Sequence, residues 1–442
     1  MPAVAAQADD DLPDNCTSSA QKGGGLRIKC EGGLGKNEEL EGTEFADTII
    51  IVPDKDALSK SPALGMGASV DAGGGDDLIT VEYDDEGVIG SIEGGAGNDT
   101  ITVSGTPSTT ARQPAVAKEG SIVGGAGTDK IKISGLEGNA GRIKGGESGG
   151  SISVTTELKG QPANRGTIEA AGGTVSLRGE GVAHGGAGSL IKTKNTEITL
   201  TGGKGHPANA GRIEASGGKV IVRGGQGAAG NDKSGEITGA TTVEVTAGDG
   251  GKGATGNLGK ITNVASAKVK GGAGSFFDGQ GLAGGVGNSG TVTTTGALRI
   301  EGGAGGHGLA GANGSATGDA WAGNGGNGGD GGDGGAGNTG TAASSGGKVT
   351  VIGGAGGNGG KGGDAVNSGR NKTDLAGDGG AAGNGGAGST GSLTAAQGAE
   401  AAATGGKPGK AGAAGAGFTN GGKSGKPGRP GTEGAGGTIT RR

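Results

Sequence analysis

Short stretches of alternating apolar and polar residues recur along most of this chain, and glycine pairs separate them. Alternation over four to six residues predicts a strand with one buried face. An isoleucine marks the first such stretch of each repeat, and the markers follow one another at spacings of 25, 23, 22, 24 and 24 residues. The markers are Ile143, Ile168, Ile191, Ile213, Ile237 and Ile261.

A second alternating stretch keeps step with the first. Two short strands per unit of about 24 residues, bounded by glycine pairs, are typical of β-solenoid rungs. One rung cannot bury its apolar row alone, whereas stacked rungs can. We therefore predict an all-β fold, a β-solenoid with two short strands per rung. The apolar pairs of the second strands are Val175/Leu177, Ile198/Leu200, Val220/Val222, Val243/Val245 and Ala267/Val269.

Beyond residue 270 both strands continue, but the connection between them lengthens. The first-strand markers become Val292, Ala342, Leu393 and Ile439, at spacings of 31, 50, 51 and 46 residues. Second strands follow at Leu298/Ile300, Val349/Val351 and, more weakly, Ala399/Ala401. All the growth falls between a second strand and the next first strand, so successive insertions must lie side by side. They occupy 271–289, 302–339, 353–390 and 404–436.

A three-residue period fills these insertions. In WAGNGGNGGDGGDGGAGNTG, residues 321–340, every third position carries Asn, Asp or Ala between glycine pairs. The extended polyproline-II type of helix has this period, rises about 3.1 Å per residue and has no internal hydrogen bonds. We expect packed polyglycine-II helices that bond to their neighbours. A collagen triple helix competes at Gly422–Gly437, but it needs much longer uninterrupted runs.

Three nonapeptides precede the regular repeats: AGGGDDLIT at 72–80, GGAGNDTIT at 94–102 and GGAGTDKIK at 124–132. They resemble the repeats of haemolysin-type (repeats-in-toxin) calcium-binding proteins. The resemblance implies that Asp77, Asp99 and Asp129 are calcium ligands. The motifs begin 22 and 30 residues apart rather than in tandem. The alternative is that each Asp only accepts local N–H groups at a glycine turn.

The glycine-rich region after residue 270 resembles proteins built from packed polyglycine-II helices. These are the snow-flea antifreeze proteins, the tip adhesins of some bacteriophages and the PGRS domains of mycobacterial surface proteins. The GGAGGNGG and GGDGGAGN runs carry this resemblance. It implies a fold and transfers no functional residue.

Composition alone is typical of a disordered chain, because 119 of 442 residues are glycine and 11 are proline. The repeat periods change that interpretation. One tryptophan, one tyrosine and four phenylalanines leave little for base stacking, so we expect no nucleic-acid partner. No apolar run is long enough for a transmembrane segment.

Cys16 and Cys30 are the two cysteines, and a disulfide between them is favoured over two free thiols in an oxidising compartment. Ala6-Gln7-Ala8 before Asp9 looks like a signal-peptidase site, although the usual charged and apolar regions do not precede it. The expected location is therefore secreted, extracellular or at a cell surface.

These patterns divide the chain into four predicted regions. Residues 1–57 are a leader and N-terminal cap, and 58–140 form a calcium-repeat-like β-solenoid. Residues 141–270 form the regular β-solenoid, and 271–442 carry the expanded rungs with their polyglycine-II layer and a C-terminal strand.

The net charge of −6 is distributed unevenly. Residues 1–57 carry 12 acids and 5 bases, whereas residues 401–442 carry 7 bases and one acid, Glu433. Opposite charges favour head-to-tail assembly into a homo-polymer; the alternative is two solvated tails.

No arrangement of residues indicates an enzyme. His184, His206 and His307 lie in separate glycine-rich turns, where we expect them to be exposed. We predict a secreted structural protein that self-assembles into a fibre or surface layer. One alternative is a surface or phage-type adhesin that contacts a cell surface or glycan, and another is an ice-binding protein.

Overall fold

The computed structural model describes residues 12–53, 62–84, 86–105, 113–314, 324–366, 374–417 and 423–442. All regular structure in these residues is β-strand, which confirms the predicted all-β class. Among them there is no helix that could cross a membrane. The chain forms two compact units. The first consists of Met1–Gly203, Asn209–Ile221 and Glu236–Thr242, and the second of Lys204–Ala208, Val222–Gly235 and Val243–Arg442.

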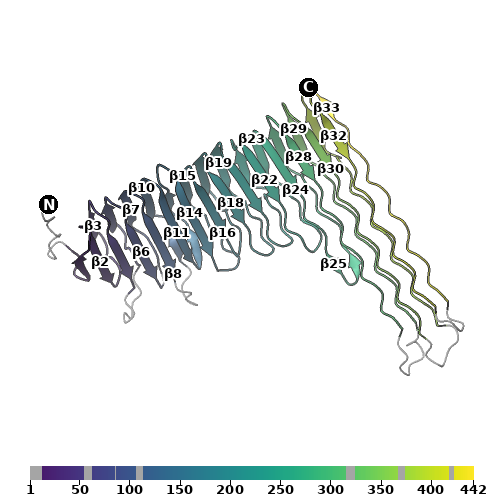
Figure 1. The fold of residues 1–442 in the computed structure, drawn as a ribbon, viewed down its shortest axis with the longest axis horizontal. Helices are drawn as coiled ribbons and strands as arrows, with labels where there is room; N and C mark the ends of the chain where they lie inside the picture. Colours follow the sequence, from purple (N-terminus) through teal and green to yellow (C-terminus); the bar gives the residue numbers. More distant parts are fainter. Residues whose placement is uncertain are drawn as a thin grey trace. The chain divides into compact units, whose positions relative to one another are not determined.

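The first unit contains two long sheets, and from β2 onward successive strands alternate between them, apart from β9 and β12 (Figure 1). One sheet has the order β1 (Cys16–Ala20), β2 (Leu26–Glu31), β4 (Thr48–Val52), β6 (Leu78–Tyr83), β8 (Thr100–Gly105), β11 (Asp129–Gly135), β14 (Gly150–Thr156), β16 (Thr174–Arg178) and β18 (Glu197–Thr201). The other has the order β3 (Glu39–Thr43), β5 (Ser69–Gly73), β7 (Ser91–Ala96), β10 (Ser121–Ala126), β13 (Arg142–Lys144), β15 (Thr167–Ala171), β17 (Leu190–Lys194), β19 (Arg212–Ser216) and β21 (Glu236–Thr238). A short pair joins β9 (Pro114–Val116) to β12 (Glu137–Asn139).

Strands from successive repeats pair in parallel and in register. Ile143 pairs with Ile168, Ile168 with Ile191, and Ile191 with Ile213. All four side chains are 0% exposed. Because adjacent strands lie about 4.8 Å apart, each isoleucine packs against its equivalents in the neighbouring strands. Long parallel sheets with such rows are consistent with the predicted β-solenoid.

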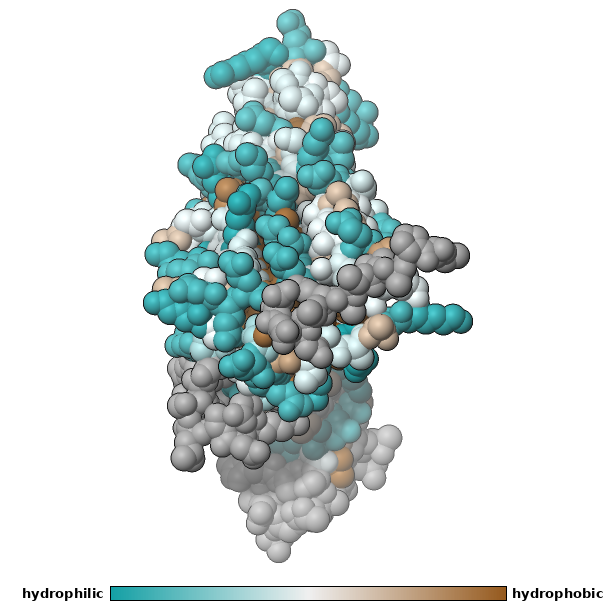
Figure 2. All heavy atoms as spheres, turned by 90° about the vertical axis from the view of Figure 1, so that its left-hand side faces the viewer, coloured by the Kyte–Doolittle hydropathy of each residue, from teal (hydrophilic) through white to brown (hydrophobic). Residues whose placement is uncertain are grey.

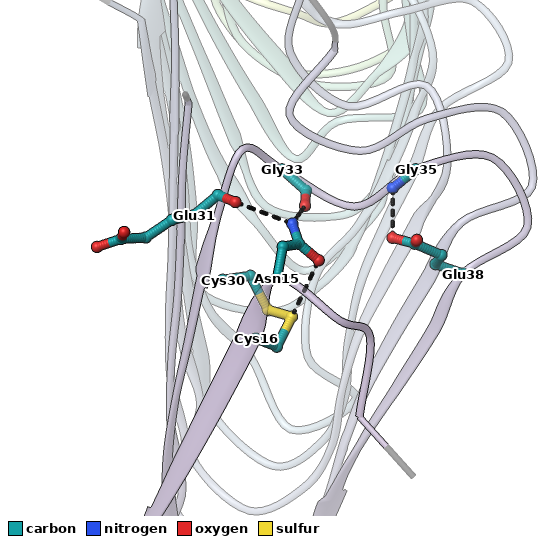
Figure 3. Close-up of a disulfide and its surroundings, with 7 residues drawn as sticks. All are labelled: Asn15, Cys16, Cys30, Glu31, Gly33, Gly35 and Glu38. Carbon is teal, nitrogen blue, oxygen red and sulfur yellow. Dashed lines mark hydrogen bonds between the residues drawn. A yellow bond between two sulfur atoms is a disulfide. The ribbon is translucent and has the colours of Figure 1, made fainter. Parts of the chain in front are cut away.

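The edge of β2 is covered by an antiparallel strand. β1 pairs with β2 in the register Cys16 to Cys30, and the two sulfur atoms form a disulfide (Figure 3). Beside it the Asn15 side chain donates hydrogen bonds to the carbonyls of Glu31 at 3.0 Å and Gly33 at 2.5 Å. A covered strand edge offers fewer free backbone groups to other chains.

The second unit continues the same alternation. One of its sheets has the order β24 (Ser266–Lys270), β28 (Leu298–Glu301), β30 (Val349–Ile352) and β32 (Ala401–Thr404). The other has the order β23 (Lys260–Val264), β27 (Thr291–Thr294), β29 (Thr341–Ser344), β31 (Ser392–Ala395) and β33 (Thr440–Arg441). The boundary between the units falls within β20 (Lys219–Arg223) and β22 (Thr242–Thr246).

Between its two sheets the chain of the second unit runs outward and returns, and we call these segments arms. Four arm pairs succeed one another, and the first is short and ends in the hairpin β25 (Phe276–Phe277) and β26 (Gln280–Gly281). Figure 1 shows the later arms as long traces side by side. The described parts of arm pairs two, three and four are 302–314 with 324–337, 353–366 with 374–388, and 404–417 with 423–437.

On the face drawn in Figure 2, hydrophilic side chains predominate and hydrophobic ones appear as isolated spots. Scattered apolar residues of this kind are normal on a protein surface.

Candidate functional site

A column of buried aspartates follows the glycine turns of the first unit. The N–H of Asp47 donates to Oδ1 of Asp77 at 2.6 Å, that of Asp77 to Oδ1 of Asp99 at 2.9 Å, and that of Asp99 to Oδ1 of Asp129 at 2.9 Å. Each carboxylate therefore ties its own rung to the preceding one. The turns can stack this closely because Gly125 has a φ of +108°, and a Cβ on it would meet the carbonyl of Gly95.

The second oxygen of three of these carboxylates has no partner. Oδ2 of Asp77, Asp99 and Asp129 is buried without a hydrogen bond. Burial, aided by the neighbouring carboxylates, raises the pKa of Asp77 to about 7 and that of Asp99 to about 6. Burial also raises the pKa of Asp129. The column therefore disfavours three adjacent negative charges unless a cation or a proton compensates them.

The predicted calcium ligands Asp77, Asp99 and Asp129 thus lie in one column, at equivalent positions of successive rungs. Unpartnered carboxylate oxygens are the donor type that calcium prefers. However, calcium needs six to eight oxygens, and no group of three or more acids, histidines or cysteines converges within the described segments. Calcium binding stays a prediction.

The aspartate column makes the first unit sensitive to pH when no cation is bound. Because the folded pKa of Asp99 lies above the ordinary value of 3.8, its contribution to stability is complete below about pH 4 and is lost as the pH rises to about 6. Between pH 4.5 and pH 8 the free energy of unfolding should therefore fall less in Asp99→Asn than in the unmodified protein, by on the order of 2 kcal/mol. Urea unfolding at pH 4.5 and pH 8 in chelator measures the change.

The matched control is Glu93→Gln, which removes a carboxylate charge from an exposed strand position that does not contribute to the raised pKa of Asp99. Equal pH profiles for the two variants would contradict the assignment of the pH dependence to the buried column. Repeating the measurement with calcium tests metal binding, because stabilisation by calcium that Asp99→Asn abolishes would identify the column as the ligand.

A second buried column, made mainly of asparagines, begins where the aspartates end. In the first unit Nδ2 of Asn139 donates to Oδ1 of Asn164 at 2.8 Å, and Asn164 contacts Nδ1 of His184 at 3.0 Å. Equivalent positions of the earlier rungs carry apolar residues, so the change of side chain marks a change of rung type. Those residues are Leu34, Leu64, Val88 and Val116.

The asparagine column of the second unit is longer. Asn231 donates to Asn257 at 2.7 Å, Asn257 to Asn288 at 2.7 Å, and Asn288 to Asn338 at 2.8 Å. All four side chains are 0% exposed. Each Nδ2 also reaches a backbone carbonyl, such as that of Gly259 at 3.2 Å. Buried amides that are bonded on both sides hold successive turns in register.

The expectation that His184 is exposed is wrong. Its side chain is 0% exposed because it occupies a position of the asparagine column. Nε2 lies 3.1 Å from the carbonyl of Arg212, so Nε2 carries the hydrogen and Nδ1 accepts from Asn164. Burial lowers the pKa of His184 to about 4. His307, by contrast, is exposed and accepts the N–H of Asn358 through Nδ1 at 2.8 Å.

His184 makes the fold sensitive to acid, in the direction opposite to the aspartates. Its folded pKa lies below the ordinary 6.5, so its contribution is complete above about pH 6.5 and is lost as the pH falls towards 4. His184→Asn places the residue type of the neighbouring rungs at this position. Between these pH values we expect the free energy of unfolding to fall less in this variant than in the unmodified protein, by on the order of 2–3 kcal/mol. Thermal unfolding of both proteins at pH 4.5 and pH 7 tests this, with the exposed His307→Asn as control. Identical acid profiles for all three proteins would contradict it.

The arms carry a hydrogen-bond network with a three-residue period. The N–H of the first glycine of a triplet bonds to the same arm of the next pair, as from Gly356 to Lys407 at 2.9 Å. The N–H of the second glycine bonds to an opposite arm, as from Gly357 to Gly332 at 2.7 Å. Backbone donors thus find partners in two directions, which offsets the entropy lost by ordering glycine.

Where the third position of a triplet is Asn or Asp, its side chain supplies a further bond. Oδ1 of Asn327 accepts the N–H of Asp378 at 2.9 Å, and Oδ1 of Asp378 accepts that of Lys426 at 2.7 Å. Asp330 and Asp333 act in the same way on Ala381 and Asn384. These side chains are exposed, so the Asn and Asp ladder forms the outer row of the arms and joins successive pairs.

The first unit also has a shallow cavity of about 460 Å³ beside the ends of β13, β15, β17 and β19. Three lysines line it, Lys144, Lys192 and Lys194, together with Glu147 and Glu169. The two acids pair with Lys144 and Arg142.

The sequence matches no family model, and comparison with curated proteins and with solved structures finds no significant match.

Proposed function

We propose that this chain is a secreted structural protein, a β-solenoid whose second unit carries a two-layer lattice of polyglycine-II helices. The observation that supports this role most directly is the hydrogen-bond network of the arms. A triplet can use its three N–H groups on three different partners, as Gly356, Gly357 and Asn358 do on Lys407, Gly332 and His307. A lattice of this kind is rigid although its chains are rich in glycine.

The polyglycine-II assignment rests on the period and on the direction of the bonds. A helix with three residues per turn points successive N–H groups in three directions and has no internal hydrogen bonds. Closely spaced chains of this type need glycine at the contacts. A Cβ on Gly328 or Gly331 would lie closer than 3.0 Å to the backbone of 353–366.

Assembly is the second part of the proposed role. The opposite charges of residues 1–57 and 401–442 favour head-to-tail contact between copies, and lowering the salt concentration strengthens such contact. Light scattering and negative-stain electron microscopy of the purified protein at low salt, with calcium and with chelator, test this. We expect filaments or layers; a monomer under all these conditions would contradict the assembly.

A binding module at a cell surface is the second candidate, and the cavity of the first unit favours it. Lys192 and Lys194 lie at its rim and have no ion-pair partner among the described residues. The cavity is therefore suited to an acidic group, such as the carboxylate of a sugar. A glycan-binding assay that compares the protein with Lys192→Gln/Lys194→Gln tests this candidate, and equal signals would contradict it.

A further inference from the structure

The fourth arm pair, 404–417 with 423–437, differs from the third at the positions that hold a following pair. Ten N–H groups of the third pair donate to carbonyls of the fourth. They belong to residues 353, 356, 359, 362, 365, 376, 379, 382, 385 and 388. Gly356 donates to Lys407 and Gly379 to Lys426, so the equivalents of these two glycines are the next residues in the fourth pair, Pro408 and Pro427.

One more of these ten positions, the third in all, also carries proline. Ala382 donates to the carbonyl of Arg429 at 2.9 Å, which makes Pro430 its equivalent. All three prolines are exposed. Proline has no N–H and fits the polyproline-II backbone. The fourth pair therefore keeps the helix but loses three of the donors that would face a fifth pair.

The side-chain acceptors disappear from the same edge. In the third pair Asn358, Asp364, Asp378 and Asn384 accept backbone N–H groups of the fourth. The residues that donate those N–H groups, and thus hold the equivalent places in the fourth pair, are Lys410, Ala416, Lys426 and Thr432. Only Thr432 has a side-chain oxygen, a hydroxyl that donates to Asn384 at 2.9 Å, so three of the four side-chain acceptors are lost.

We infer that the fourth arm pair is a closed edge, which prevents the lattice of a second copy from stacking on it. Missing donors and missing acceptors are independent changes, and both occur where a fifth pair would bond. Exposed lysines also repel the equivalent edge of a second copy, because Lys407, Lys410 and Lys426 have no ion-pair partner among the described residues. Proline and lysine on an exposed edge are the known means of preventing edge-to-edge association.

This inference rests on the hydrogen bonds between the third and fourth arm pairs and not on the proposed structural role. It restricts that role, because copies drawn together by opposite charges cannot then continue the backbone hydrogen bonds of the lattice across this edge. Failure of the assembly test leaves the closed edge intact, and stacking through the edge would overturn the closed edge but not the assembly.

The test opens the edge by restoring N–H donors at the three prolines and amide acceptors at two of the lysines. The variant carries Pro408→Gly, Pro427→Gly, Pro430→Gly, Lys410→Asn and Lys426→Asn. Its control carries Lys410→Ala and Lys426→Ala with the prolines retained, so both variants lose two positive charges. Sedimentation velocity over a concentration series is expected to show self-association at least about tenfold tighter for the open-edge variant than for the control.

Hydrogen exchange locates the contact and does not require the variant to fold. In the unmodified protein the amides of Ala411 and Ala414, which stand at edge positions, are expected to exchange fast at every concentration. Concentration-dependent protection of these two amides in the unmodified protein would overturn the inference. So would an open-edge variant that retains the exchange pattern of the third arm pair but associates no more tightly than the control.

Discussion

Replacing Gly328 and Gly331 by valine is expected to separate the second arm pair from the third and to destabilise the second unit by more than about 4 kcal/mol. A Cβ at either position would lie closer than 3.0 Å to backbone atoms of Gly360 or Gly357, which real Cβ atoms essentially never do. The arms cannot move apart without losing the bonds from Gly328 to Asp378 and from Gly331 to Ala381, both at 2.8 Å. Limited proteolysis and thermal unfolding measure the loss.

The matched control adds the same side chain at a third position of the triplet. Ala381→Val places its methyl groups on the half-exposed outer row and should change stability by less than about 0.5 kcal/mol. The unfolding transition of the first unit should be the same in all proteins. If the double valine variant kept its full stability, the packed-lattice interpretation would be wrong and the arms would be linkers.

Removing one amide from the buried asparagine column is expected to have the second-largest effect. Asn257→Ala takes away the acceptor of Asn231 and the donor to Asn288 and to the carbonyl of Gly259. Each buried group left without a partner costs about 1–3 kcal/mol, so the total is expected to be on the order of 3–5 kcal/mol. The midpoint and slope of urea unfolding measure this loss.

An exposed asparagine provides the comparison. Asn327→Ala removes one bond, to the N–H of Asp378, at a position that water can reach. Its cost should not exceed about 1 kcal/mol. If the two substitutions cost the same, the asparagine column would not stabilise the fold through its buried bonds.

The rows of paired strands could be predicted because equivalent residues of successive rungs lie beside each other. Val292, Ala342 and Leu393 pair in register as their spacing predicts. The prediction was wrong where apolar side chains become small: the strand after Val349 continues at Ala401 rather than at Ala399, because Val349 pairs with Ala401. A run of alanines has no size contrast to define its register.

The asparagine column was missed although it leaves a signal in the sequence. Asn139, Asn164, Asn257, Asn288 and Asn338 each precede a first-strand marker by four residues. In a glycine-rich turn an isolated asparagine is usually exposed, and burial becomes favourable only when the next rung supplies an amide in the same place. The amide bonds between rungs exist only after the rungs have stacked, so they cannot be predicted from the sequence of one repeat.

The aspartate positions followed from a motif, but their bonding did not. The nonapeptides predict that Asp77, Asp99 and Asp129 lie at glycine turns, and the structure shows that each Oδ1 accepts the N–H of the preceding rung. Asp47 belongs to the same column, although its turn, GTEFAD, lacks the glycine pattern of the motif. The position of an aspartate in its rung, rather than the surrounding motif, therefore decides whether it belongs to the column.

Hydrogen exchange of the arm glycines tests the central claim most directly. If stacked arms satisfy the backbone, the glycine amides of 353–363 and 376–388 should exchange far more slowly than in an unfolded chain, with protection comparable to that of the strands β28 and β30. The first and second glycines of each triplet should be equally protected, because their bonds run to different neighbours. Exchange of these amides at the rate of an unfolded chain, with the strands still protected, would contradict the account.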